Sequence, residues 1–211
     1  MIAPEGKIII IPLVCLLSIG TLIYLYNPIN IIKGINIFLL IVNIFCLYFF
    51  RDPNRAVPNT GGFLSPADGK IVKIISVQDS LIGKATQISI FLSVFNVHIQ
   101  RVPLSGKVLK KDYNAGRFHA AFKDKASKDN EQTSILFESD GNKFIIKQIA
   151  GLIARRIVNY MNPDELVQRG QRMGFIRFGS RVDIIVPENF EIDIALGDIV
   201  IGNKTIIGRF N

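Results

Sequence analysis

The stretch TQISIFLSVF, residues 86–95, places an apolar side chain at every second position. Ile88, Ile90, Leu92 and Val94 therefore share one face if the chain is extended. This period of two, in a run rich in β-branched and aromatic residues, predicts a β-strand with one buried face.

Similar short runs recur further along the chain and are separated by turn residues. They are GKIVKIISV (69–77), SILFE (134–138), KFIIKQIA (143–150), VDIIVP (182–187) and DIVIG (198–202). One helix or helical turn is expected in GLIARRIVNY (151–160). Many short strands with few helices are typical of a mainly β domain of the α+β class.

Two internal similarities indicate how these strands fold back on one another. SPADGKIVK (65–73) and VPLSGKVLK (102–110) share a P-x-x-G-K turn that leads into an apolar strand. ALGDIVIGNKTIIGRF (195–210) is similar to the Gly-Asp hairpin of biotinyl and lipoyl carrier domains, although no biotinyl-lysine or lipoyl-lysine motif is present. We expect a barrel-sandwich-like arrangement.

The amino-terminal part has a different composition. Residues 8–26 and 34–50 are two apolar runs joined by NPIN (27–30), and a bilayer span needs about 20 such residues. We expect residues 1–56 to form a hydrophobic helical hairpin that anchors the protein in a membrane, with a re-entrant or interfacial hairpin as the alternative. Residues 57–211 form the second domain, and VPNTGG at its start is expected to be a linker.

Charge predicts the orientation of this anchor. Arg51 and Arg55 follow the second run, whereas the short turn between the runs has only Lys33 nearby. The positive-inside rule then places both termini, and the second domain, on the cytoplasmic face of the membrane. The chain carries a net charge of +8, which suits anionic headgroups, and no nucleic-acid motif is present.

Cysteine and histidine are too few to indicate a metal site or a disulfide framework. Cys15 and Cys46 both lie within the apolar runs, where they are expected to be small buried hydrophobes. His98 and His119 are the two histidines. A His/Cys metal site is therefore not expected. A carboxylate-rich magnesium site is the alternative that counting leaves open, but no acidic cluster in the sequence suggests one, and we expect no metal.

GFIRFGSRVDIIVP, residues 174–187, contains the pair Gly179-Ser180. The ordinary interpretation is a turn that enters a strand. The alternative is self-cleavage, in which the Ser180 hydroxyl attacks the preceding carbonyl and glycine relieves the crowding there. Elimination and hydrolysis would then leave a pyruvoyl group, a built-in ketone that accepts electrons as pyridoxal phosphate does. The pair by itself does not decide between them.

Two further residues are candidates to assist Ser180. His98 follows a predicted strand in FNVHIQRVP, and it is the better placed general base, because His119 in GRFHAAF is expected on the surface or in a substrate channel. Asp68 in SPADG could orient that imidazole, as in a catalytic triad. The structural alternatives are a histidine at a strand edge and an aspartate that caps its own turn.

Five ordered blocks together resemble the short, membrane-anchored bacterial type of phosphatidylserine decarboxylase. The blocks are SPADGKI (65–71), NVHIQRVPLSGKV (96–108), NEQ (130–132), QIAGLIARRIV (148–158) and GFIRFGSRVDIIVP (174–187). The resemblance spans about residues 50–211, and the apolar runs are similar to that type's membrane anchor.

The resemblance implies a proenzyme that cleaves itself between Gly179 and Ser180. The products would be a β chain of residues 1–179 and an α chain of residues 180–211 that begins with a pyruvoyl group derived from Ser180. The family's Asp-His-Ser set corresponds to Asp68, His98 and Ser180. The two chains would form a heterodimer, with higher oligomers left open.

The implied reaction is decarboxylation of phosphatidylserine in the membrane to phosphatidylethanolamine through a Schiff base with the pyruvoyl group. Arg155, Arg156 and Arg177 are candidates to hold the lipid phosphate, with Arg169 and Arg172 as further candidates. Solvated arginines on a basic face are the ordinary interpretation of the same residues. The alternative function is a non-catalytic, membrane-tethered barrel-sandwich adaptor.

The chain departs from the family pattern at two positions. Arg181 follows Ser180 as in the short type, where many other members carry threonine, and Arg101 stands where longer members carry a second histidine. The second departure makes His98 the expected proton donor in both self-cleavage and decarboxylation.

Overall fold

A computed structural model describes residues 1–116, 130–151, 156–177 and 180–211. The chain divides into two compact units, Met1–Asn54 and Arg55–Asn211, and each is considered by itself.

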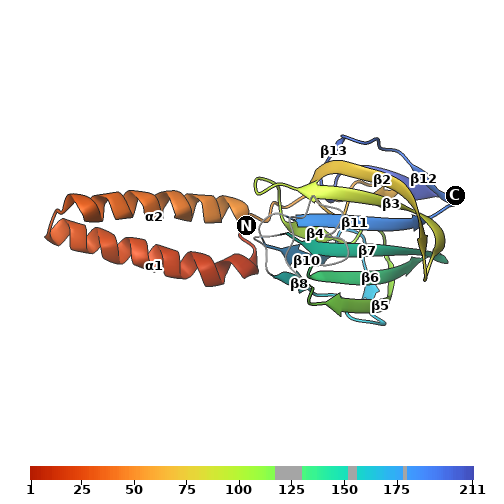
Figure 1. Cartoon of the computed structure of the whole chain (residues 1–211), viewed down its shortest axis with the longest axis horizontal. Helices are drawn as coiled ribbons and strands as arrows, with labels where there is room; N and C mark the ends of the chain where they lie inside the picture. Colours follow the sequence, from red (N-terminus) through yellow and green to blue (C-terminus); the bar gives the residue numbers. More distant parts are fainter. Residues whose placement is uncertain (117–129, 152–155, 178–179) are drawn as a thin grey trace. The chain divides into compact units, whose positions relative to one another are not determined.

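The first unit is a pair of apolar helices, α1 (Pro4–Tyr26) and α2 (Asn30–Phe49) (Figure 1). Pro4 lies in the first turn of α1, where its missing N–H has no helical partner to lose. Both helices are long and apolar enough to cross a membrane. The predicted helical hairpin is confirmed.

Two contacts align the helices of the hairpin. Nδ2 of Asn43 donates a hydrogen bond to the carbonyl oxygen of Leu13, at 3.3 Å. A Cβ atom on Gly20 would overlap Oδ1 of Asn36, so glycine allows a close approach there. Leu13 of α1 is next to Asn43 of α2, and Gly20, further along α1, is next to Asn36, which comes earlier in α2. The two helices are therefore antiparallel.

The second unit is built on an eight-stranded antiparallel sheet (Figure 1). In order across the sheet, its strands are β13 (Ile199–Val200), β2 (Gly69–Asp79), β3 (Gly83–Leu92), β11 (Ser180–Pro187), β7 (Asn142–Ala150), β6 (Gln132–Ser139), β5 (Gly106–Asn114) and β9 (Leu166–Val167). All six strands predicted from the sequence are confirmed here. β3 ends at Leu92, however, so Val94 lies beyond it.

Two three-stranded sheets complete this unit. One has the order β4 (Ile99–Arg101), β10 (Arg172–Ile176), β8 (Ile157–Asn159), and the other β1 (Phe63–Leu64), β14 (Ile206–Phe210), β12 (Phe190–Ile192).

The helix predicted over residues 151–160 is wrong in its described second half. Residues 157–159 form strand β8, and Val158 pairs with Phe175 of β10. Residues 152–155 lie outside the described ranges. A short apolar run does not distinguish helix from strand, and the neighbouring strand supplied the hydrogen-bond partners that decided it.

The main core lies on one face of the large sheet. Val182, Ile184 and Val186 of β11 are fully buried there, next to Ile88 and Ile90 of β3. Alternate residues of a strand point to opposite faces, so Ser180 lies on this same face. The architecture confirms a mainly β fold preceded by an apolar helical hairpin, with β11 in the interior of its sheet.

Candidate active site

Ser180 is the first residue of β11 and is fully buried. It pairs with Leu92 on β3 and with Ala150 on β7, so its backbone is held from both sides. Within the described ranges, Oγ of Ser180 has no hydrogen-bond partner. Gly179 lies outside those ranges. A buried hydroxyl without a partner is uncommon in proteins and suggests a chemical role.

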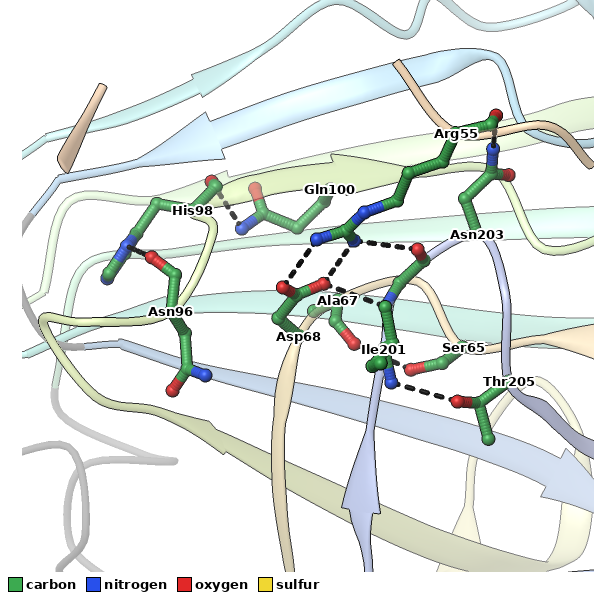
Figure 2. Close-up of polar contacts among 11 residues, drawn as sticks. Arg55, Ser65, Ala67, Asp68, Asn96, His98, Gln100, Ile201, Asn203 and Thr205 are labelled. Carbon is green, nitrogen blue, oxygen red and sulfur yellow. Dashed lines mark hydrogen bonds and ion pairs between the residues drawn. The ribbon is translucent and has the colours of Figure 1, made fainter. Parts of the chain in front are cut away.

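His98 lies between β3 and β4, and its side chain is buried. Its Nδ1 atom is 3.0 Å from the carbonyl oxygen of Asn96 (Figure 2). A carbonyl oxygen only accepts hydrogen bonds, so Nδ1 must carry a proton. The neutral imidazole then has its lone pair on Nε2, as a general base requires.

Main-chain hydrogen bonds bring the segments that contain His98 and Ser180 into one region. The N–H of Ile176, shortly before Ser180 in the chain, donates to the carbonyl oxygen of His98 at 3.3 Å. Leu92, shortly before His98, is the β3 partner of Ser180. Two independent pairings thus connect the segments that carry the two residues.

Asp68 lies in the turn that leads into β2, and its carboxylate is bound by Arg55 (Figure 2). The main chain of Gly202 binds it as well. Nη2 of Arg55 is 2.8 Å from Oδ2, Nη1 contacts Oδ1, and the N–H of Gly202 is 2.8 Å from Oδ1. The contact at Nδ1 of His98 comes instead from Asn96. An orienting role of Asp68 toward His98 therefore stays a prediction.

Arg55 is not predicted from the sequence as a partner of Asp68; there it is only a charge that orients the anchor. Thirteen positions separate it from Asp68 and 147 from Gly202, whose carbonyl it also contacts. No local pattern links residues that far apart.

A chain of hydrogen-bonded side-chain amides is also not predicted from the sequence. It consists of the buried Gln100 and Gln148 and the half-buried Asn159. Nε2 of Gln100 donates to the carbonyl oxygen of His98 at 2.8 Å, and Oε1 of Gln100 accepts from Gln148 at 2.8 Å. Oε1 of Gln148 in turn accepts from Asn159 at 2.7 Å. Gln100 and Gln148 are fully buried. The chain joins β4, β7 and β8 and supports the main chain at His98.

Comparison with known proteins identifies the family. The family model described as phosphatidylserine decarboxylase matches residues 42–208. The chain belongs to the phosphatidylserine decarboxylase family. The family resemblance of the sequence blocks is thereby confirmed.

Several curated relatives carry the name phosphatidylserine decarboxylase proenzyme. The protein of Wolbachia pipientis wMel is 45% identical over 186 residues, which cover 84% of this chain and 81% of the relative. That of Desulfotalea psychrophila is 45% identical over 174 residues, 81% of each chain. That of Nitratidesulfovibrio vulgaris is 39% identical over 211 residues, 99% of this chain and 94% of the relative.

Arg181 lies on the face of β11 opposite Ser180. It is the residue that stands where many members of the decarboxylase family carry threonine. Its Nε atom is 2.9 Å from Oδ1 of Asp183, and both side chains are almost completely buried. Nε2 of Gln87 also donates to Asp183, at 3.1 Å. Burial raises the pKa of Asp183, and the charge of Arg181 opposes that rise. The strand that begins with Ser180 is therefore braced on both faces.

The arginines proposed to hold the lipid phosphate of a decarboxylase substrate are only partly described. Arg155 lies outside the described residues. Arg156 is exposed, and its carbonyl oxygen accepts a hydrogen bond of 3.3 Å from the N–H of Arg177, which is half-buried. Arg156 and Arg177 are thus adjacent, and their role toward substrate stays a prediction.

The two further arginine candidates have contacts within the protein. Nη1 of Arg169 donates to the carbonyl oxygen of Pro58 at 2.9 Å. Pro58 belongs to the predicted linker (57–62), which this hydrogen bond connects to the domain. Arg172 lies over the ring of Tyr160, 5.6 Å from its centroid. His119 lies outside the described residues.

Proposed function

We propose that this chain is a phosphatidylserine decarboxylase proenzyme that cleaves itself between Gly179 and Ser180 and then converts phosphatidylserine to phosphatidylethanolamine. The observation that carries the proposal is the buried Ser180 hydroxyl at the start of an interior strand of a family member. The adaptor alternative gives no reason to bury that hydroxyl, and the family does not favour it.

Self-cleavage begins with a proton transfer. Nε2 of His98 takes the proton of Ser180 Oγ as this oxygen adds to the carbonyl carbon of Gly179, and an ester replaces the amide. Loss of the α-proton of Ser180 expels the Gly179 carboxylate and leaves dehydroalanine. Water then adds, ammonia leaves, and residue 180 ends as a pyruvoyl group.

The surroundings of Ser180 fit such a group. Ser180 is fully buried, and its strand partners are the apolar Leu92 and Ala150. The pyruvoyl group supplies an electron sink for the electrons left behind when CO₂ departs. The buried position limits the access of bulk water and so favours loss of the carboxylate charge. His98 returns a proton to the substrate Cα.

The setting proposed for the reaction is the cytoplasmic face of a bacterial inner membrane. Two helices long enough to cross a bilayer, followed by Arg51, support it. The β chain, residues 1–179, and the α chain, residues 180–211, would remain together as a heterodimer. Arg155, Arg156 and Arg177 are the proposed contacts of the lipid phosphate.

The test is intact-mass spectrometry of the purified full-length protein, together with CO₂ release from detergent micelles that contain carboxyl-labelled phosphatidylserine. We expect two chains that meet at residues 179 and 180, a pyruvoyl mass on the smaller one, and CO₂ release. Ser180→Ala should stay a single chain and release no CO₂. A wild-type protein that remains one intact chain with serine at position 180 would refute the proposal.

A further inference from the structure

Arg55 begins the β unit, and its side chain is largely buried against Asp68, with 15% and 11% of the two side chains exposed. Both terminal nitrogens of the guanidinium face both oxygens of the carboxylate (Figure 2). This two-point, charge-assisted arrangement fixes the rotation of the carboxylate as well as its position.

Gly202 and Asn203, in the C-terminal segment, form hydrogen bonds with both Arg55 and Asp68. Nη1 of Arg55 donates to the carbonyl oxygen of Gly202 at 2.8 Å, and the N–H of Gly202 donates to Asp68. Nδ2 of Asn203 donates to the carbonyl oxygen of Arg55 at 3.1 Å. Arg55 is thus held at its side chain and its main chain by residues of the proposed α chain.

Glycine at position 202 favours this close contact. A Cβ atom on Gly202 would lie 3.2 Å from Oδ1 of Asp68 and 3.2 Å from Cα of Ala67, which is tighter than ordinary contacts. Asn203 has a φ of 63°, a left-handed conformation that asparagine tolerates better than most residues. The segment is therefore shaped to approach Asp68.

The main chain around Asp68 is braced separately. Oγ of Ser65 donates to the carbonyl oxygen of Ala67 at 2.7 Å, and the N–H of Asn203 donates to Ser65 at 3.0 Å. The N–H of Arg101 donates to Pro66 at 2.9 Å. With this turn held by other residues, the contribution of Arg55 is to orient the carboxylate.

We infer that Arg55 is a positioning residue, which orients the carboxylate of Asp68 during self-cleavage and joins the two chains at that point afterwards. The inference rests on the proposed function and on the predicted role of Asp68 in orienting His98 for self-cleavage. Arginine suits the task because its planar fork matches both carboxylate oxygens, whereas lysine offers a single point charge.

The first test compares the self-cleavage rates of full-length variants in detergent, followed on denaturing gels. Arg55→Ala should cleave more slowly by on the order of 100-fold, because a small misplacement near reacting groups has effects of that size. Arg55→Lys should fall between Arg55→Ala and wild type. Arg209→Ala, which breaks an ion pair with Asp193 in which the Arg209 side chain is 61% exposed, is the matched control and should cleave normally.

The second test asks whether Arg55 acts through Asp68. The double variant Arg55→Ala/Asp68→Ala should cleave at the rate of Asp68→Ala alone, since the orienting contact is already gone. The inference would be overturned if the double variant cleaved more slowly than Asp68→Ala by the full factor seen for Arg55→Ala alone. It would also be overturned if Arg55→Ala cleaved at the rate of Arg209→Ala.

Melting temperatures in a Ser180→Ala background separate positioning from folding, because every variant then stays one chain. If Arg55→Ala fails to fold, Arg55→Lys decides: slow cleavage at an unchanged melting temperature supports positioning, and normal cleavage refutes it. A wild-type chain that never cleaves contradicts the proposed function itself. Wild-type cleavage with Arg55 variants that match the control contradicts only the role of Arg55.

Discussion

Arg181 and Asp183 form an ion pair with 3% and 2% of their side chains exposed, directly after the proposed cleavage site. Removing one partner of such a pair leaves an uncompensated buried charge. In a Ser180→Ala background, Arg181→Met should lower the free energy of unfolding by about 3–5 kcal/mol at neutral pH. Thermal melting monitored by circular dichroism measures this loss.

The pH dependence of the same variant has a defined sign. Burial raises the pKa of Asp183 above its ordinary value of 3.8, so the folded state binds a proton more tightly than the unfolded state. Stability is then full below 3.8 and is lost as pH rises through the raised pKa. Without Arg181 the pKa rises further, so the melting temperature should fall as the pH is raised from below 3.8 through that higher pKa. The double variant Arg181→Met/Asp183→Leu should be insensitive to pH there, and a flat profile for Arg181→Met would contradict the prediction.

Strand β4 is joined to β7 and β8 by the amides of Gln100, Gln148 and Asn159. Gln148→Leu would remove the partner of Oε1 of the buried Gln100 and the partner of Nδ2 of the half-buried Asn159. We expect the free energy of unfolding, measured by urea titration in the Ser180→Ala background, to fall by about 1–3 kcal/mol. Self-cleavage with serine at position 180 should also slow, because Gln100 contacts the carbonyl oxygen of His98.

The matched control for Gln148 is Asn189, whose amide makes an exposed hydrogen bond to Asn142. Asn189→Ala removes a side-chain hydrogen bond of the same kind in a solvated place and should change neither stability nor cleavage. Equal behaviour of Gln148→Leu and Asn189→Ala would show that the buried amide chain has no such importance.

For the whole molecule, the proposed α chain is interleaved with the rest of the domain. β11 lies between β3 and β7, β13 pairs with β2, and β14 pairs with β1. After cleavage we expect both chains to elute together on size-exclusion chromatography in detergent and to separate on a denaturing gel. Elution of the smaller chain by itself under native conditions would contradict this sheet topology.

The local sequence determined the helical hairpin, six of the strands and the family. The hairpin and the strands follow from the length of apolar runs and from a period of two, which are properties of neighbouring residues. The family follows from the resemblance of five ordered sequence blocks. The same reasoning assigned Val94 to a strand that ends at Leu92 and expected a helix where β8 lies. In both places the hydrogen-bond partners available across the sheet decided the outcome.

The sequence also singled out Ser180, His98 and Asp68 as candidates, but their partners came only from the tertiary structure. Arg55 meets Asp68 and Gly202 because turns and strand register bring distant segments together. A carboxylate, an amide or an imidazole accepts many different partners. Which one it obtains is decided by the packing of the whole domain, and composition and spacing do not contain that information.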